Sequence, residues 1–232
     1  MASKKKDPSK PAKKAKKTKE KKPKPKAGKR EQNKEKTRQK ILEAALHLFR
    51  KKGFQFTTTK AISRKADIAE GTLFNYFESK EDLALYFFDQ QLDDAIAWYR
   101  SEENLADAPV TEKLFALINR NLEAIEPYED FIGAVYLRAL QPRSKLHPLS
   151  LESQERNIRY LRFLQEILDE AEENGEIPPL GQMGPYAVGL FYIGIITYWL
   201  NDTSPGKGRT LAFLDRALQL GTSFIKKGGW EW

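Results

Sequence analysis

The chain has 232 residues, with 40 Lys and Arg, 32 Asp and Glu, and no cysteine. Without cysteine there is no disulfide framework, no thiolate nucleophile and no Cys-ligated metal site. The formal net charge of +8 is unevenly spread: residues 1–30 hold 15 basic and two acidic residues, whereas residues 81–232 hold 14 basic and 24 acidic residues. Charge asymmetry of this kind favours a polyanionic partner.

The absence of metal-binding and catalytic motifs argues against further classes of protein. His47 and His147 lie far apart with no metal-ligand spacing, and the chain shows no Ser–His–Asp set and no Gly-rich phosphate loop. We therefore expect no enzyme activity, no metal and no cofactor. The longest apolar run, residues 186–200, is about 15 residues and shorter than a bilayer requires. No apolar stretch follows the N-terminal charges, so we expect a soluble cytoplasmic protein without a signal peptide.

Residues 1–30 form a Lys-rich arm with almost no apolar residues. Such a segment cannot bury enough surface to offset its ordering entropy, so we expect it to be disordered when free. It is interpreted either as a solubilising tail or as an arm that neutralises phosphates on nucleic acid without reading sequence. Composition alone does not decide between the two.

The rest of the chain is patterned at helical period, and no strand-like alternation persists. We predict an all-α protein of nine helices, with Thr58 and Ser79 as N-caps. Adjacent acids such as Asp93-Asp94 and Glu172-Glu173 are expected on solvated helix faces. The predicted helices span about residues 33–52, 57–65, 69–77, 79–100, 110–126, 128–140, 150–174, 182–200 and 208–226.

The second and third predicted helices, joined by a short turn and packed on the first, make a helix-turn-helix unit. The local sequence closely resembles the N-terminal domain of the tetracycline-repressor (TetR) family over about 50 residues. The resemblance is carried by Thr37-Arg38, Ile41-Leu42, Ala44-Ala45, Leu48-Phe49, Gly53-Phe54, Thr57-Thr58, Ile62 and the run from Gly71 to Leu83. It implies a helix-turn-helix DNA-binding domain at 31–80 and a helical ligand-binding and dimerisation domain at 81–232.

The small core of this unit is expected from apolar side chains of all three helices, namely Ile41, Ala45, Leu48, Phe49, Ile62, Leu73, Phe74 and Phe77. By position, the resemblance implies that a first group, Thr59, Thr72, Tyr76 and Lys80, contacts the DNA backbone. It implies that a second group, Lys60, Glu70, Gly71 and Asn75, lies nearest the bases. The candidate DNA-binding residues are Thr58, Thr59, Lys60, Ala69, Glu70, Gly71, Thr72, Asn75, Tyr76 and Lys80. Thr58 is equally explained as a simple N-cap, and Lys60, Glu70 and Lys80 as ordinary surface residues.

The chain departs from the family pattern at four positions of the unit. Asp67 stands where Gly is usual, which the left-handed conformation tolerates. Ala69 replaces a common Ser or Thr cap, and Phe74 replaces a frequent Tyr. Glu70 stands where Lys or Gln is common; a carboxylate there repels phosphate but can accept a hydrogen bond from cytosine N4. We therefore predict that Glu70 reads a cytosine.

For the C-terminal domain, the resemblance implies a homodimer formed by the helices at about 182–200 and 208–226, and a small-molecule cavity. The first of these helices is apolar nearly all round, which suits either an interface or a fully buried core helix. The candidate ligand-binding residues are Phe131, Tyr136, Arg138, Tyr160, Phe163, Phe191 and Tyr192, although aromatic stripes are more often core.

The sequence thus favours a dimeric, sequence-specific regulator of transcription, usually a repressor, which binds a palindromic operator in double-stranded DNA. An unknown small-molecule effector would release it by binding one dimer geometry better than another. The alternative is an architectural protein that binds DNA mainly through the Lys-rich arm of residues 1–30.

Overall fold

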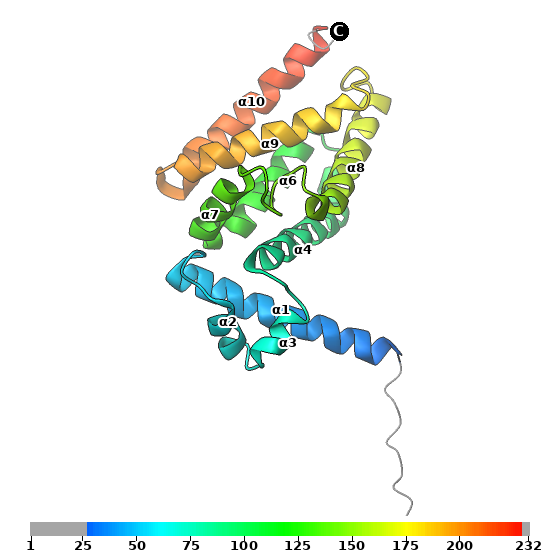
Figure 1. Ribbon diagram of the computed structural model, residues 1–232. Coiled ribbons are helices and arrows are strands. Elements are labelled where there is room, and N and C mark those ends of the chain that lie inside the picture. Colours follow the sequence, from blue (N-terminus) through cyan, green and yellow to red (C-terminus); the bar gives the residue numbers. More distant parts are fainter. Residues whose placement is uncertain (1–26, 229–232) are drawn as a thin grey trace, which may run out of the picture. The chain divides into compact units, whose positions relative to one another are not determined.

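The computed structural model describes residues 27–228 (Figure 1). The predicted arm lies almost wholly outside the described residues, so its conformation stays a prediction. Residues 27–36 form a unit of their own, and the features below belong to residues 37–228.

The described chain is all-α, and each of the nine predicted helices has a counterpart. The first helix begins earlier than expected, and a single-turn helix, α5, follows the fourth. The bounds are α1 (Ala27–Lys52), α2 (Thr59–Lys65), α3 (Glu70–Phe74), α4 (Lys80–Ser101), α5 (Glu103–Ala106), α6 (Val110–Ile125), α7 (Glu129–Ala139), α8 (Leu151–Glu173), α9 (Met183–Asn201) and α10 (Gly208–Lys226), with 3₁₀ turns η1 (Glu126–Tyr128) and η2 (Pro205–Lys207).

Local sequence signals explain where the first helices begin and end. Gly53 ends α1 with a φ of +82°, a conformation that glycine adopts without steric cost. Thr58 caps α2 by accepting a hydrogen bond from the Ala61 amide at 3.1 Å, as predicted. Ser79 and Asp82 form a reciprocal capping box at the start of α4. These caps fix the two ends of the helix-turn-helix segment.

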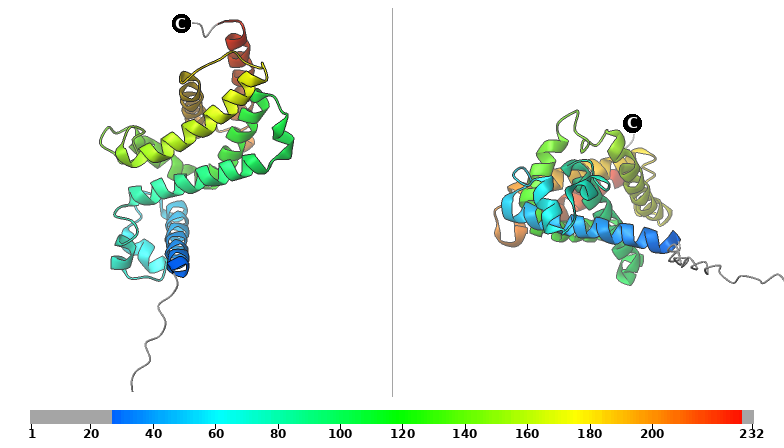
Figure 2. Two further views of the ribbon diagram at one scale, coloured as in Figure 1. Left: turned by 90° about the vertical axis from the view of Figure 1, so that its right-hand side faces the viewer. Right: turned by 60° about the horizontal axis from the view of Figure 1, so that its bottom comes forward.

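Side chains of α1, α2 and α3 share one buried core, and Ile41, Ile62 and Leu73 are fully inaccessible. In Figure 2, α2 and α3 lie beside the part of α1 on which they pack. The expectation that Phe74 belongs to this core is wrong, because its side chain is 47% exposed. Leu73 and Phe77 occupy the buried face at i and i+4, and one residue of rotation, about 100°, turns Phe74 outward.

Helix α4 leads from the helix-turn-helix segment into the C-terminal helices, where it packs on α6 and α8 (Figure 1). Charged side chains join α4 to α8 along its length: Asp89 pairs with Arg156 at 3.6 Å, Asp93 with Arg159, and Arg100 with Glu166 at 3.0 Å. Asp93 is exposed, as expected for a solvated helix face, and it also pairs across to α8. It faces a basic residue that is 66 positions away in sequence.

Helix α9 buries only part of its apolar surface. Ile195, Ile196 and Trp199 are buried, whereas Leu190 is 70% exposed. The described residues contain one helix, α9, with the length and hydropathy of a membrane span, a test that helices of soluble proteins also pass. The limited burial excludes the alternative of a fully buried core helix in the monomer.

Candidate nucleic-acid interface

The α2–turn–α3 segment has the backbone of a helix-turn-helix. The Ile68 amide donates to the Ser63 carbonyl at 3.0 Å, which closes the turn. Asp67 lies in this turn with a φ of +53°. The predicted left-handed residue is thus present where the family usually has glycine, because the short polar side chain of Asp tolerates this conformation.

The N-terminal part of α2 presents the first group of candidate contacts. Thr58 and Lys60 are exposed, and Thr59 is partly exposed. The Thr58 hydroxyl is occupied by its capping bond to the Ala61 amide. The neighbouring Thr57, which was not a candidate, is buried and donates to the Gly53 carbonyl at 2.8 Å, so it holds α2 to the end of α1.

Helix α3 presents a second group. Ala69, Gly71 and Asn75 are exposed, while Thr72 and Tyr76 are partly buried. A Cβ at Gly71 would meet no described atom within 4 Å, so glycine is not required there by the packing of this chain. The candidates of α2 and α3 therefore reach solvent on one short segment, as a surface that reads DNA must.

Phe74 is a residue that the sequence interpretation placed in the core and that the structure leaves about half exposed at the end of α3. Its exposed ring follows Leu73 at the end of α3. An apolar side chain at a DNA surface can contact a thymine methyl group. The signal that could have found it is the helical spacing itself, since Leu73 and Phe77 already fill the buried positions.

Glu70 is held by a contact between the two short helices. The Thr59 hydroxyl donates to Glu70 Oε1 at 3.0 Å. A carboxylate has about four acceptor positions, so Oε2 stays available for a further donor. Because the bond limits the rotamers of Glu70, it points the carboxylate in a defined direction from the surface of α3.

Lys80, a predicted phosphate contact, makes internal contacts in this structure. Its ammonium donates to the Phe54 carbonyl at 2.8 Å and the Gln55 carbonyl at 3.2 Å, and lies 4.9 Å from the centre of the Phe54 ring. Burial, followed by the charge of Arg138, lowers the pKa of Lys80 from its usual value. A phosphate contact would have to share this ammonium with the α1–α2 loop.

The surroundings of the unit are basic. Residues 31–80 hold 11 basic and six acidic residues. The positive charge of Lys65, followed by burial and the charges of Lys51 and Arg50, lowers the pKa of His47. The C-terminal turns of α1 and α2 thus create a positive potential, which is the electrostatic requirement for DNA.

The seven candidate ligand-binding residues do not line one cavity. Phe131 is buried among Phe49, Phe54 and Phe87, with ring centroids 5.0–5.7 Å apart. The Tyr136 and Thr197 hydroxyls share a hydrogen bond of 2.6 Å.

The other candidate ligand residues have separate surroundings. Arg138 pairs with Glu81. Phe163 is buried against Tyr99. Tyr160 and Tyr192 form a ring pair at 6.3 Å, and burial raises the pKa of both phenols.

Phe191 alone among the seven lines one of the described pockets, an apolar cavity of about 210 Å³ between α6, α8, α9 and α10. Its walls are mostly aliphatic, with Leu168 and Leu218 among them, and Gly221 on α10 contributes no side chain. The cavity is smaller than the roughly 300 Å³ at which drug-sized ligand sites begin. A bound apolar chain would therefore have to widen it.

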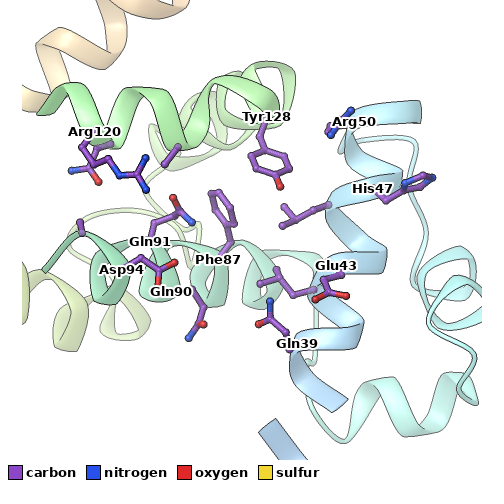
Figure 3. Close-up of a pocket in the computed structure, with 15 residues that line it drawn as sticks. Gln39, Glu43, His47, Arg50, Phe87, Gln90, Gln91, Asp94, Arg120 and Tyr128 are labelled. Atoms are coloured by element: carbon purple, nitrogen blue, oxygen red, sulfur yellow. The ribbon is translucent and has the colours of Figure 1, made fainter. Parts of the chain in front are cut away.

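A larger pocket, of about 430 Å³, lies between α1, α4 and α6 (Figure 3). Its lining is polar: Arg50 and Arg120 project from α1 and α6, and Glu43 and Asp94 from α1 and α4. None of the seven candidates contributes to it. The mixture of charges does not suit an apolar chain.

This fold and this surface define a class, the helix-turn-helix proteins that bind DNA. Two family models match the chain: "Bacterial regulatory proteins, tetR family" over residues 41–87, and "Tetracyclin repressor-like, C-terminal domain" over residues 113–231. The chain therefore belongs to the TetR family, and the protein is a DNA-binding transcriptional regulator.

Individual relatives agree with this assignment. The chain is 27% identical over 138 residues to the fatty acid metabolism regulator protein of Bacillus subtilis. The matched region covers 59% of this chain and 69% of that protein. The chain is 28% identical over 142 residues to the transcriptional repressor KstR2 of Mycobacterium tuberculosis, covering 61% and 70%.

Solved structures share the architecture. FadR of Bacillus subtilis in complex with stearoyl-CoA superposes with a TM-score of 0.63 at 24% identity, covering 81% of this chain and 98% of that one. FadR of Thermus thermophilus, a TetR-family repressor in complex with lauroyl-CoA, gives a TM-score of 0.61 at 25% identity, covering 79% and 94%.

Proposed function

We propose that this regulator is a repressor that binds a palindromic operator as a homodimer and leaves it when an acyl-CoA binds its C-terminal helices. The observation that carries the DNA-binding part is the surface of α2 and α3, on which Thr58, Lys60, Ala69, Gly71 and Asn75 are exposed and Thr59, Glu70, Thr72 and Tyr76 are partly exposed. Lys80 is also partly exposed, but its ammonium is bonded to the loop after α1. The proposed domain division is 31–80 for DNA and 81–232 for dimer and effector.

Dimerisation is supported by the apolar surface that α9 and α10 leave open. Tyr186 and Leu190 on α9, and Leu220 and Phe224 on α10, are each more than half exposed. Clustered exposed apolar side chains usually mark an interaction surface. Gly194 and Gly221 leave open space where a Cβ would stand, so a partner helix can approach closely. A two-fold dimer also matches the symmetry of a palindromic site.

The effector class is supported by two observations. Structural neighbours are regulators solved with stearoyl-CoA and lauroyl-CoA. The cavity beside Phe191 is lined by apolar side chains, as an acyl chain requires. For release, the acyl-CoA must bind the DNA-free geometry more tightly, since a ligand with equal affinity for both geometries shifts nothing. Phe131, Tyr136, Tyr160, Phe163 and Tyr192 line no described pocket and are not part of this proposal.

Two measurements test the proposal. Selection of bound sequences from random DNA should enrich a palindrome; failure to enrich any motif would favour the architectural alternative. Titration of the protein–operator complex should then show release by lauroyl-CoA and not by free CoA. Equal effects of the two, or none, would refute the effector while leaving the DNA-binding part intact. Replacing Ala217 in the cavity wall by Phe should abolish release and preserve operator binding.

The role of the arm can be separated from that of α2 and α3. Deleting residues 1–30 removes 15 basic residues and should lower affinity and flatten its salt dependence, because fewer counterions are released on binding. The selected motif should not change. Loss of all sequence preference on deletion would assign recognition to the arm instead.

A further inference from the structure

The first turn of α4 is tethered to the C-terminal helices by two basic side chains. Arg138, in the last turn of α7, donates from Nε to Glu81 Oε1 at 2.7 Å. Lys145, in the loop between α7 and α8, donates to Asp82 Oδ1 at 2.9 Å. Glu81 and Asp82 are each about one-fifth exposed. Contacts of this kind are charge-assisted and directional.

On its other side, α7 is attached to the helices proposed to form the dimer. The Tyr136 hydroxyl shares a 2.6 Å hydrogen bond with the Thr197 hydroxyl on α9. Glu129, in the first turn of α7, accepts from Lys207 at 2.7 Å, just before α10 begins. Helix α7 therefore touches both the elements that would join two protomers and the beginning of α4.

The beginning of α4 in turn contacts the DNA-binding segment at two points. The Phe77 ring, which follows α3, lies 5.4 Å from the Tyr86 ring on α4. Lys80 is bonded to the loop that ends α1. A displacement of the first turn of α4 therefore carries α3 with it.

We propose that Arg138 is a positioning residue which, through its ion pair with Glu81, fixes the separation of the two α3 helices in the dimer and so sets the spacing between operator half-sites. The inference rests on the proposed dimer. It adds to the proposed DNA-binding function: α2 and α3 would determine which half-site sequence is bound, and a contact made by α7 would determine the spacing between the half-sites.

The geometry of DNA makes spacing a sensitive readout. One base pair advances the helix by about 3.4 Å and, with 10–10.5 base pairs per turn, rotates the next half-site by about 35°. A dimer whose α3 helices are fixed loses affinity when the spacing changes by one base pair. A dimer whose α4 can move keeps more of its affinity. Loss of the Arg138–Glu81 pair therefore affects spacing and leaves half-site choice unchanged.

The experiment compares sequences selected from random DNA by three full-length variants and the unmodified protein. Arg138→Glu breaks the pair, Arg138→Glu with Glu81→Arg restores it in reverse, and Arg100→Glu is the control. Arg100 forms an equally direct pair with Glu166, also between α4 and a C-terminal helix, but near the far end of α4.

We expect the unmodified protein, the reversed pair and the control to select one spacing. Arg138→Glu should select the same half-sites at several spacings, with the preference for the native spacing over a one-base-pair change reduced about tenfold, within the range typical of coupling between sites. An unchanged single spacing for Arg138→Glu would overturn the inference, and so would relaxed spacing in the control. Absence of any palindrome with the unmodified protein would instead refute the proposed function.

Discussion

Glu70→Ala separates the reading of a base from general attraction to DNA. With Thr59 bonded to Oε1, the carboxylate has Oε2 free to accept from cytosine N4. A good side-chain–base contact discriminates by about 1–3 kcal/mol, which corresponds to roughly 5- to 150-fold in relative affinity. Removing the side chain should abolish that preference at one position of each half-site.

The same substitution should raise the overall affinity for DNA, even though it removes the preference for one base. A carboxylate close to phosphates repels them, so Glu70→Ala should bind non-cognate duplexes more tightly while losing its preference for cytosine. Thr59→Val keeps the charge and removes the hydroxyl that orients it. That variant should lose only part of the preference, about 0.5–1 kcal/mol, the net contribution of one hydrogen bond.

The assay is a fluorescence anisotropy titration of duplexes that carry each base pair at every half-site position. Glu43→Ala is the matched control, because it removes the same charge from an exposed position on α1. If the relative affinities for all base pairs were unchanged in Glu70→Ala, the role of Glu70 would be limited to linking α3 to α2 through its hydrogen bond with Thr59. The cytosine prediction would then be refuted.

Three further variants test the packing. Phe131→Ala should lower the free energy of unfolding by about 3–5 kcal/mol in a denaturant titration, because a fully buried ring is removed from the aromatic cluster; a loss below 1 kcal/mol would contradict this. Gly184→Ala should cost about 1 kcal/mol net, since the new Cβ would lie 2.9 Å from Leu180 Cβ and this strain exceeds the helix-propensity gain; a stabilised variant would argue against it. Burial opposes the charge of Asp202, but hydrogen bonds from Ser204 and Thr210 hold its pKa well below the usual value. Asp202→Asn should therefore melt lower than the unmodified protein near neutral pH, with the difference shrinking as pH falls below the ordinary carboxyl range; a constant difference would contradict this.

The sequence predicted the helices well because each depends on nearby residues. The apolar period, the glycine after α1 and the Ser79–Asp82 capping box are all local signals, and the structure contains each of them. The core of the helix-turn-helix was also predictable, with the exception of Phe74. That error came from assigning every apolar residue of α3 to the interior, although a helix of five residues has room for few inward positions.

The contacts between distant segments could not be predicted from local pattern. Arg138 was a candidate ligand anchor, and the structure pairs it with Glu81, 57 positions away. Glu172 was expected on a solvated face, but its carboxylate accepts from the Leu180 amide at 2.7 Å. Helical periodicity says which residues share a face, but not which other helix that face meets. The same limit applies to the seven candidate ligand residues, whose aromatic character does not distinguish a cluster such as that around Phe131 from a cavity wall.

Charge has two separate roles in this chain. The C-terminal residues 81–232 have ten more acidic than basic residues, yet their arginines are used where α4 meets α8, against Asp89 and Asp93. The pairs join α4 to α8, and the excess of acidic residues means that this region is repelled by phosphate. Because residues 31–80 are net basic, the long-range field turns α2 and α3 toward DNA before any base is read. Orientation thus comes from the overall charge distribution, and the choice of sequence from the few side chains on α2 and α3.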